Sequence, residues 1–314
     1  MAVTAARRAL VLRALGLGDL LTAVPALRAL RRGMPGARIT LAAPPALAPL
    51  ALATGAVDDV LPADSGLGPL PPPGPVDAAV NLHGRGPQSH RVLAALRPAR
   101  LLAFAHTGAL HTDGPDWDPG EHEVARWCRL VRAYGFDADP DDLDLAPPAV
   151  PSPAPGAVVV HPGAAFAARR WPAERFAAVA AALRAGGERV VVTGGPGEGP
   201  LAHGVVELAG LDPRDDLAGR THLPQLAALV AGARLVVCGD TGVAHLATAF
   251  RTPSVLLFGP TPPARWGPPD RAEHRVLWAG RSGDPHGGEP HPGLLEISAD
   301  QAVEAAGKAL TLHA

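Results

Sequence analysis

The segment 238–246 reads CGDTGVAHL and runs from a predicted strand through a polar turn into a predicted helix. Thr241 and the backbone amide of Gly242 would lie at the start of that helix, where unpaired N–H groups and the helix dipole favour an anion. Asp240 would bind a hydroxyl group or hold the turn together, and His245 follows one helical turn later. The segment predicts a phosphate site, although a plain capping turn with a hydrogen-bonded histidine fits the same residues.

A second candidate anion-binding segment lies at the start of the second half of the chain, where two arginines precede a predicted helix. Arg169 and Arg170 could hold a diphosphate through charge-assisted, bidentate hydrogen bonds. They could equally be solvated side chains that flank a packed Trp171. The next predicted strand ends in Thr193 and Gly194, a glycine-rich bend that suits a nucleoside lying against the backbone.

The first predicted strand ends in LGLGD at 15–19, which is only half of a dinucleotide-binding fingerprint. Leu21 occupies the position of the third glycine, and no acidic residue follows about 20 residues later to bind a ribose. Asp19 lies in the first turn of a helix, and Gly18 lets a substrate approach it, so this carboxylate could accept a proton from a hydroxyl group. The alternative is an aspartate that only stabilises the helix terminus.

The fourth predicted strand is followed by NLHGRG at 81–86, which places polar side chains and glycines at the carboxyl end of a strand. Asn81, His83 and Arg85 could contact a substrate. A glycine turn without any ligand explains the same residues, and nothing local decides between the two.

The elements that must position these residues alternate between short apolar strands and alanine-rich helices, which is typical of a parallel sheet covered by helices on both faces. Strands are predicted at Ala9–Leu15, Arg38–Ala42, Asp59–Leu61, Val76–Leu82, Arg100–Phe104, Ala157–His161, Arg189–Thr193, Leu235–Gly239, Ser254–Phe258 and Arg275–Trp278. Helices are predicted at Asp19–Arg32, Pro45–Thr54, Pro87–Leu96, Glu121–Tyr134, Ala173–Arg184, Pro200–Leu211, Leu223–Ala231, Val243–Phe250 and Ala299–Leu312.

The proline-rich segment 146–156, APPAVPSPAPG, can neither continue a helix nor pair inside a sheet. We therefore predict an α/β protein with two doubly wound, Rossmann-like domains at 1–150 and 151–314, joined by this linker. Such domains bind ligands at the carboxyl ends of their strands, so a central cleft between them would suit an enzyme with two substrates.

Composition excludes several classes of protein. The formal net charge of the 314 residues is -2, and no basic cluster offers a surface for nucleic acid. The two cysteines lie far apart, which excludes a disulfide framework, and the histidines lack a third ligand at metal spacing, so no metal is predicted. The uncharged stretch 39–57 contains three prolines, which argues against a membrane helix. We expect a cytoplasmic protein.

Together the segments resemble glycosyltransferase family 9, the heptosyltransferase-like enzymes, over nearly the whole chain. The resemblance depends on GLGD at 16–19, on VVVHPGA followed by RRWPAERF within 158–176, and on GDTGVAHLATAF followed by PSVLLFGPT within 239–261.

The resemblance implies the GT-B fold and an inverting, metal-independent transfer of a sugar from a nucleotide diphosphate, typically ADP-heptose. It makes Asp19 the catalytic base and places Arg169 against the donor phosphates, at a position that is often lysine. Thr241 and Gly242 match the pyrophosphate turn, with Asp240 and His245 beside the donor sugar. The first domain would hold the acceptor and the second the nucleotide. The linker would act as a hinge that closes the two domains and excludes water.

The acceptor stays open, because the first domain offers few cations for acceptor phosphates; Arg85, Arg91 and Arg97 are the candidates. A glycan, a glycolipid or a small-molecule glycoside would each fit, and a glycolipid acceptor would bring the enzyme to the inner face of the cytoplasmic membrane. The alternatives are a donor with UDP or GDP and a hexose, a binding protein that has lost catalysis, and a nicotinamide oxidoreductase, against which the incomplete fingerprint counts.

Overall fold

The computed structural model describes residues 7–71 and 74–311. The chain divides into two compact units, Met1–Leu145 and Ala146–Ala314. No helix or strand runs through the proline-rich segment 146–156, as predicted, since proline has no N–H group to donate.

The first unit contains a five-stranded parallel sheet in the order β3-β2-β1-β4-β5. All five predicted strands are confirmed, with ends that differ by up to three residues. Their bounds are β1 Arg8–Leu12, β2 Arg38–Ala43, β3 Asp59–Pro62, β4 Ala78–Asn81 and β5 Arg100–Leu102.

The second unit contains a parallel sheet in the order β10-β9-β8-β6-β7, and its five predicted strands are confirmed as well. Their bounds are β6 Val158–His161, β7 Val190–Val192, β8 Leu235–Gly239, β9 Ser254–Phe258 and β10 His274–Trp278. Strands β6 to β9 are buried along their whole length, which explains their unbroken runs of valine and leucine.

The predicted helices are present within a few residues of their expected ends, and Leu312 lies outside the described residues. In the first unit they are α1 Leu17–Thr22, α2 Val24–Gly33, α3 Ala48–Ala53, α4 Gln88–Ala94 and α5 Glu123–Ala133. In the second they are α6 Ala173–Ala185, α7 Gly199–Leu208, α8 Leu223–Ala231, α9 Gly242–Ala249 and α12 Ala299–Thr311. Two short helices of this unit, α10 Pro263–Trp266 and α11 Pro292–Leu295, were not predicted. A 3-10 turn at Pro45–Leu47 precedes α3 and occupies the start of the predicted helix there.

One prediction is wrong: the single helix expected over Asp19–Arg32 is two helices. Helix α1 ends at Thr22, and the backbone N–H of Ala23 bonds to the carbonyl groups of Leu20 and Leu21. Pro25 has no N–H group with which to continue the α-helical ladder, and it sits instead in the first turn of α2.

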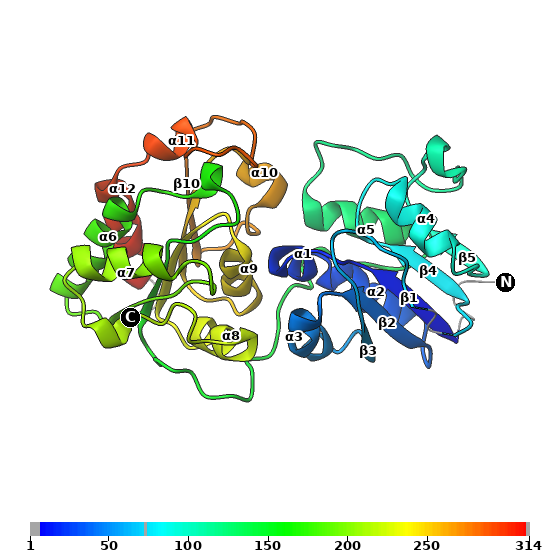
Figure 1. Cartoon of the computed structure of the whole chain (residues 1–314), viewed down its shortest axis with the longest axis horizontal. Coiled ribbons are helices and arrows are strands. Elements are labelled where there is room, and N and C mark those ends of the chain that lie inside the picture. Colours follow the sequence, from blue (N-terminus) through cyan, green and yellow to red (C-terminus); the bar gives the residue numbers. More distant parts are fainter. Residues whose placement is uncertain (1–6, 72–73, 312–314) are drawn as a thin grey trace. The chain divides into compact units, whose positions relative to one another are not determined.

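Helices cover both faces of the second sheet (Figure 1). Helices α6, α7 and α12 pack on one face in a shared apolar core with the valines of β6 and β7, while α8 and α9 pack together on the other face. Trp171 is buried in the core that α6, α7 and α12 share, and its indole N–H donates to Ile297 O at 3.1 Å. This packing fixes the loops that leave the carboxyl ends of the strands.

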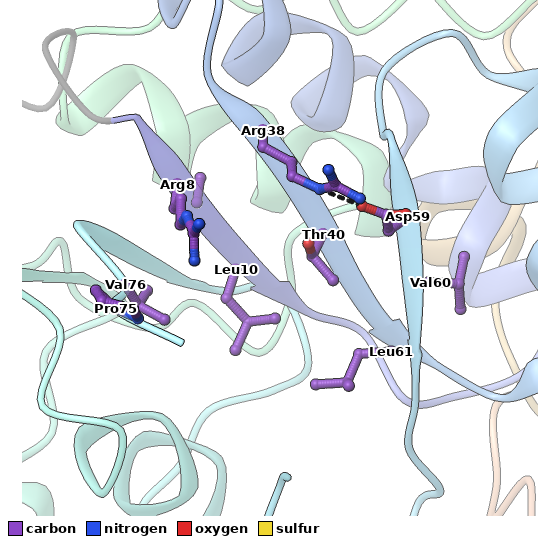
Figure 2. Close-up of a pocket in the computed structure, with 10 residues that line it drawn as sticks. Arg8, Leu10, Arg38, Thr40, Asp59, Val60, Leu61, Pro75 and Val76 are labelled. Carbon is purple, nitrogen blue, oxygen red and sulfur yellow. Dashed lines mark hydrogen bonds and ion pairs between the residues drawn. The ribbon is translucent and has the colours of Figure 1, made fainter. Parts of the chain in front are cut away.

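A pocket of about 320 Å³ lies at the amino ends of β1, β2 and β3 in the first unit. Figure 2 shows Arg38 reaching toward Asp59 along this edge, and Arg38 Nε donates to Asp59 Oδ2 at 2.6 Å. The two charges that line this part of the pocket satisfy each other. The pocket thus lies at the amino ends of the strands, whereas Asp19 follows the carboxyl end of β1.

Candidate functional site

In the first unit, the chain builds β2 and β3 on one side of β1 and then β4 and β5 on the other. Strands β1 and β4 are therefore neighbours, with Leu12 paired to Asn81. Doubly wound folds bind ligands beyond the carboxyl ends of the strands at such a reversal of strand order. Asp19 follows β1 and His83 follows β4, so the structure brings these two predicted site residues to the same place.

Asp19 is held at this point by backbone and side-chain donors. Its Oδ2 accepts from the Gly16 N–H at 3.2 Å, and its Oδ1 accepts from Arg13 Nη2 at 3.2 Å. The side chain keeps 26 % of its surface exposed, so a substrate can reach it. Burial raises the pKa of the Asp19 carboxyl, and the nearby cation of Arg13 opposes that rise only in part. This carboxylate is a stronger base than a solvated one.

Arg13 and Glu123 are site residues that the sequence analysis missed. Both side chains are buried, and Arg13 Nη2 lies 2.9 Å from Glu123 Oε1. Their ion pair is a signal only in the folded protein, because Arg13 and Glu123 are 110 residues apart in the chain.

The loop after β4 is organised by Asn81, which is completely buried. Its Nδ2 donates to Gly84 O at 3.2 Å and to Ser89 Oγ at 3.0 Å, and its Oδ1 accepts from the His83 N–H at 3.1 Å. The structure thus places Asn81 beneath the loop that it was predicted to share with a ligand, where it fixes the position of His83.

His83 is half-buried, and its Nδ1 accepts from the Ala14 N–H at 3.2 Å. Burial, together with the charge of Arg13, lowers the pKa of His83 to about 4. The ring is therefore neutral at pH 7, and because Nδ1 accepts, Nε2 carries the proton. His83 offers one N–H donor to a ligand, and the neighbouring Arg85 is exposed.

A pocket of about 430 Å³ lies beside this loop, within the first unit. Apart from Leu67, its lining residues are glycines or carry polar side chains. It is lined by Ser65, Gly66, Leu67, His83, Gly84, Arg85, Gly86, Gln88 and Ser89. Neutral hydrogen-bonding groups of this kind recognise hydroxyl groups, and Arg85 adds one cation.

The second unit has the same kind of reversal between β6 and β8, which pair through His161 and Cys238. Thr241 is the N-cap of α9, and its Oγ1 accepts from the Val243 N–H at 3.3 Å. The N–H groups of the first turn of this eight-residue helix point to the carboxyl end of the sheet. Cys238 is buried in β8.

Arg169 lies beside this helix terminus, with Nη1 at 3.9 Å from Asp240 Oδ2. The Nε of Arg169 is buried and has no hydrogen-bond partner among residues 7–71 and 74–311. Arg170 is placed differently, since its Nε donates to Ala164 O at 2.8 Å and so ties down the turn after β6. A buried guanidinium N–H without an acceptor, next to a helix N-terminus, is suited to an anionic ligand.

Glu198 is a further residue that the sequence analysis missed. Its Oε2 accepts from the Gly195 N–H at 2.7 Å and lies 3.9 Å from Nε2 of the buried His161. A Cβ at Gly163 would collide with the Glu198 carboxylate, so glycine there makes room for it. The signal in the sequence is an acid that closely follows the glycine-rich bend after β7, the bend that contains Gly194.

The last predicted residues lie near the same strand ends. Thr193, directly after β7, is buried, and its N–H donates to Val160 O at 2.9 Å. The imidazole of His245 in α9 packs edge-on against Trp266, with ring centroids 5.9 Å apart. The structure thus brings Arg169, Asp240, Thr241 and His245 to one end of the second sheet.

Residues 7–71 and 74–311 contain no group of three or more His, Cys, Asp or Glu side chains that could hold a metal ion. Among the helices of the described part of the chain, none has the length and apolar character to cross a membrane.

Comparison with known proteins gives a consistent result. The sequence profile of glycosyltransferase family 9 (heptosyltransferase) matches residues 115–286. The chain is 34 % identical over 154 residues to lipooligosaccharide heptosyltransferase 2 of Haemophilus influenzae, and 32 % identical over 153 residues to lipopolysaccharide heptosyltransferase 2 of Escherichia coli K12. These alignments cover 46 % of this chain and 44 % and 43 % of the two relatives. The chain thus matches less than half the length of these curated relatives.

Two solved structures are similar over almost the whole chain. The E. coli ADP-heptose LPS heptosyltransferase II superposes with a TM-score of 0.78 at 21 % identity, covering 98 % of this chain and 99 % of that one. The family 9 glycosyltransferase from Veillonella parvula gives a TM-score of 0.79 at 22 % identity, covering 98 % of each chain. At these identities the similarity establishes the fold, which is the predicted GT-B fold with two Rossmann-like units.

Proposed function

The chain belongs to glycosyltransferase family 9, and on that premise we propose that it transfers heptose from ADP-heptose to a hydroxyl group of a glycan, glycolipid or small-molecule glycoside. The observation that carries the proposal is the anion site at the start of α9. There Thr241 caps the helix and the buried Nε of Arg169 has no acceptor among the described residues. The diphosphate of a nucleotide sugar supplies acceptor oxygens and negative charge for such a site.

The second unit binds the donor in this proposal. Arg169 and the first turn of α9, from Gly242 onward, hold the diphosphate and stabilise it as the leaving group. Arg170 holds the turn after β6 in place and adds positive charge. The bend at Thr193 and Gly194 lies against the nucleoside.

Three further candidate side chains of the second unit bind sugars in this proposal. Asp240 and His245 lie beside the donor heptose. Glu198 is suited to the ribose hydroxyl groups, because a carboxylate next to a glycine-rich bend accepts hydrogen bonds from a diol.

The first unit supplies the base and the acceptor site. The acceptor lies against Gly18 and in the pocket next to His83 and Arg85, with the neutral His83 donating from Nε2 to a hydroxyl oxygen. Asp19 takes the proton of the attacking hydroxyl group while the oxygen of that hydroxyl group bonds to the anomeric carbon. The bond from that carbon to the diphosphate oxygen breaks, and ADP leaves with the electron pair. Attack from the face opposite to ADP inverts the anomeric centre.

The proposed reaction needs no metal ion, because Arg169 and the α9 terminus carry the charge stabilisation. Turnover unchanged by EDTA supports this part of the proposal, and turnover that is lost in EDTA and restored by a divalent cation contradicts it. We also propose a cytoplasmic location, at the inner face of the membrane if the acceptor is a glycolipid; cell fractionation tests both.

Substitution of Asp19 by Asn tests the proposed function. We expect turnover to fall by about 10²–10⁴-fold, the usual contribution of a general base, while ADP affinity stays at the wild-type value. Asp137, an exposed acid of the same unit, provides the matched control in Asp137→Asn. Wild-type turnover in Asp19→Asn would remove the base assignment. Tight ADP binding without turnover in the wild-type protein would favour the alternative of a binding protein without catalysis.

A further inference from the structure

Arg13, just after β1, is a buried cation that ties together several segments of the first unit. Its Nε donates to the backbone oxygen of Asp19 at 2.9 Å, and its Nη1 donates to Leu82 O at 2.6 Å. Its Nη2 faces three acceptors: Glu123 Oε1 at 2.9 Å, Asp19 Oδ1 at 3.2 Å and Thr22 Oγ1 at 3.2 Å. One guanidinium group is thus shared between two carboxylates.

Glu123, the first residue of α5, is the more strongly engaged of these two carboxylates. Its Oε1 also accepts from Trp127 Nε1 at 2.8 Å, and its Oε2 pairs with Arg126. Burial alone would raise the pKa of Glu123, but the charges of Arg13 and Arg126 and its hydrogen bonds lower it overall. Glu123 is therefore ionised, and the side chains of Asp19, Arg13, Glu123 and Arg126 form a row of alternating charges.

The geometry shows how Arg13 is divided. Its contact with Glu123 is 0.3 Å shorter than its contact with the Asp19 carboxylate (2.9 against 3.2 Å), and only one of its nitrogens reaches that carboxylate. A bidentate Arg13–Asp19 pair would hold the carboxylate more strongly in its charged form and weaken it as a base.

We propose that Glu123 is a positioning residue for the base: by drawing Arg13 toward α5, it leaves Asp19 oriented but only partly neutralised. The inference rests on the proposed role of Asp19. Glu123 itself touches no reacting atom, and it acts on the reaction only through Arg13.

Few other groups in the first unit act on the charge of Asp19. Helix α1 carries no other charged side chain. The segment after β1 contributes Arg13, and α5 contributes Glu123 with Arg126 behind it. The loop after β4 contributes His83, which is neutral above about pH 5 because its pKa is about 4. Glu123 is thus the group that counterbalances Arg13.

Substitution of Glu123 by Gln keeps the size and a hydrogen-bonding oxygen while it removes the charge. The full charge of Arg13 then acts on Asp19, and we expect the pKa of Asp19 to fall by about one unit. The rate rises with pH as the base loses its proton, so the acid limb of the kcat/KM profile moves to lower pH. Because a weaker base gives a slower proton transfer, the plateau also falls.

The direct test is the pKa of the Asp19 carboxyl, measured by NMR on protein with 13C-labelled aspartate and assigned with Asp19→Asn. This readout needs no substrate. Glu121→Gln is the matched control, because Glu121 lies two residues away and pairs at 2.8 Å with Arg129. Glu123→Asp keeps the buried charge but moves it away from Arg13, so it completes a graded series and serves if Glu123→Gln does not fold.

We expect the pKa of Asp19 to fall in the order wild type, Glu123→Asp, Glu123→Gln, with no change in Glu121→Gln, and the pH profiles to follow the same order. An Asp19 pKa that is the same in all four proteins overturns the inference, even if Asp19→Asn is inactive and the proposed function stands. Full activity in Asp19→Asn overturns the proposed function, and the positioning role with it.

Discussion

Removal of the Arg169 charge is the perturbation that most sharply probes the donor site. Its guanidinium group lies 3.9 Å from Asp240, its side chain is 23 % exposed, and its Nε is buried without an acceptor in the described part of the chain. A hydrogen bond to a charged group contributes about 1.5–3 kcal/mol. Since 1.4 kcal/mol corresponds to a factor of ten, Arg169→Gln should weaken ADP binding by about 10–100-fold.

Calorimetry with ADP and with adenosine separates the diphosphate from the nucleoside. The affinity for adenosine should not change in Arg169→Gln, because that ligand has no phosphate. Arg189→Gln is the matched control: Arg189 also lies 3.9 Å from an acid, Asp215, but it precedes β7 at the opposite end of the strands. An equal loss of ADP affinity in both variants, or an unchanged affinity in Arg169→Gln, would refute the assignment of Arg169 to the donor phosphates.

Two predictions concern stability. Thr241→Val removes the N-cap of α9 and should lower the free energy of unfolding by about 1 kcal/mol in urea titrations, whereas Thr241→Ser should keep it; equal stability of the two variants would show that the cap is unimportant. Burial lowers the pKa of His274 to about 4, below its value of about 6.5 in the unfolded chain, so its contribution is present above about pH 6.5 and declines as the pH falls toward 4. Unfolding of His274→Gln should therefore depend less on pH between 7 and 4.5 than unfolding of the wild type, and an identical dependence would contradict the reasoning.

The sequence was sufficient to predict the strands and their grouping into two parallel sheets. Runs such as Val158–Val160 or Leu235–Val237 are buried on both faces, and only a central parallel strand has that environment. The break at Ala23 was missed even though Pro25 is visible in the sequence. Proline is accepted in the first turn of a helix, and the sequence alone did not show that Pro25 lies in the first turn of a second helix.

The candidate site was predictable only where its signal is local. Asp19, Thr241 and their glycines lie where a strand is followed by a helix, so their patterns point to strand ends. By contrast, the pair Arg13–Glu123 joins residues that are far apart in the chain, and no local pattern marks it. Glu198 follows a glycine-rich bend, but its pairing with the distant His161 is visible only in the folded protein.

Asn81 illustrates a different limit of sequence analysis. A polar residue at a strand end can face a ligand or lie beneath a loop, and burial alone distinguishes the two cases. Its side-chain amide hydrogen-bonds to the turn that carries His83, and local sequence does not separate this role from contact with a ligand.

The measurement that tests the central claim most directly is a calorimetric titration with ADP, UDP, GDP and NAD, each with EDTA and then with magnesium. The account predicts that ADP binds most tightly and that its affinity is the same in EDTA, which would justify transfer assays with ADP-heptose. A preference for UDP or GDP would contradict the heptose donor while retaining a glycosyltransferase. Tight binding of NAD, with none of the diphosphates, would contradict the account as a whole.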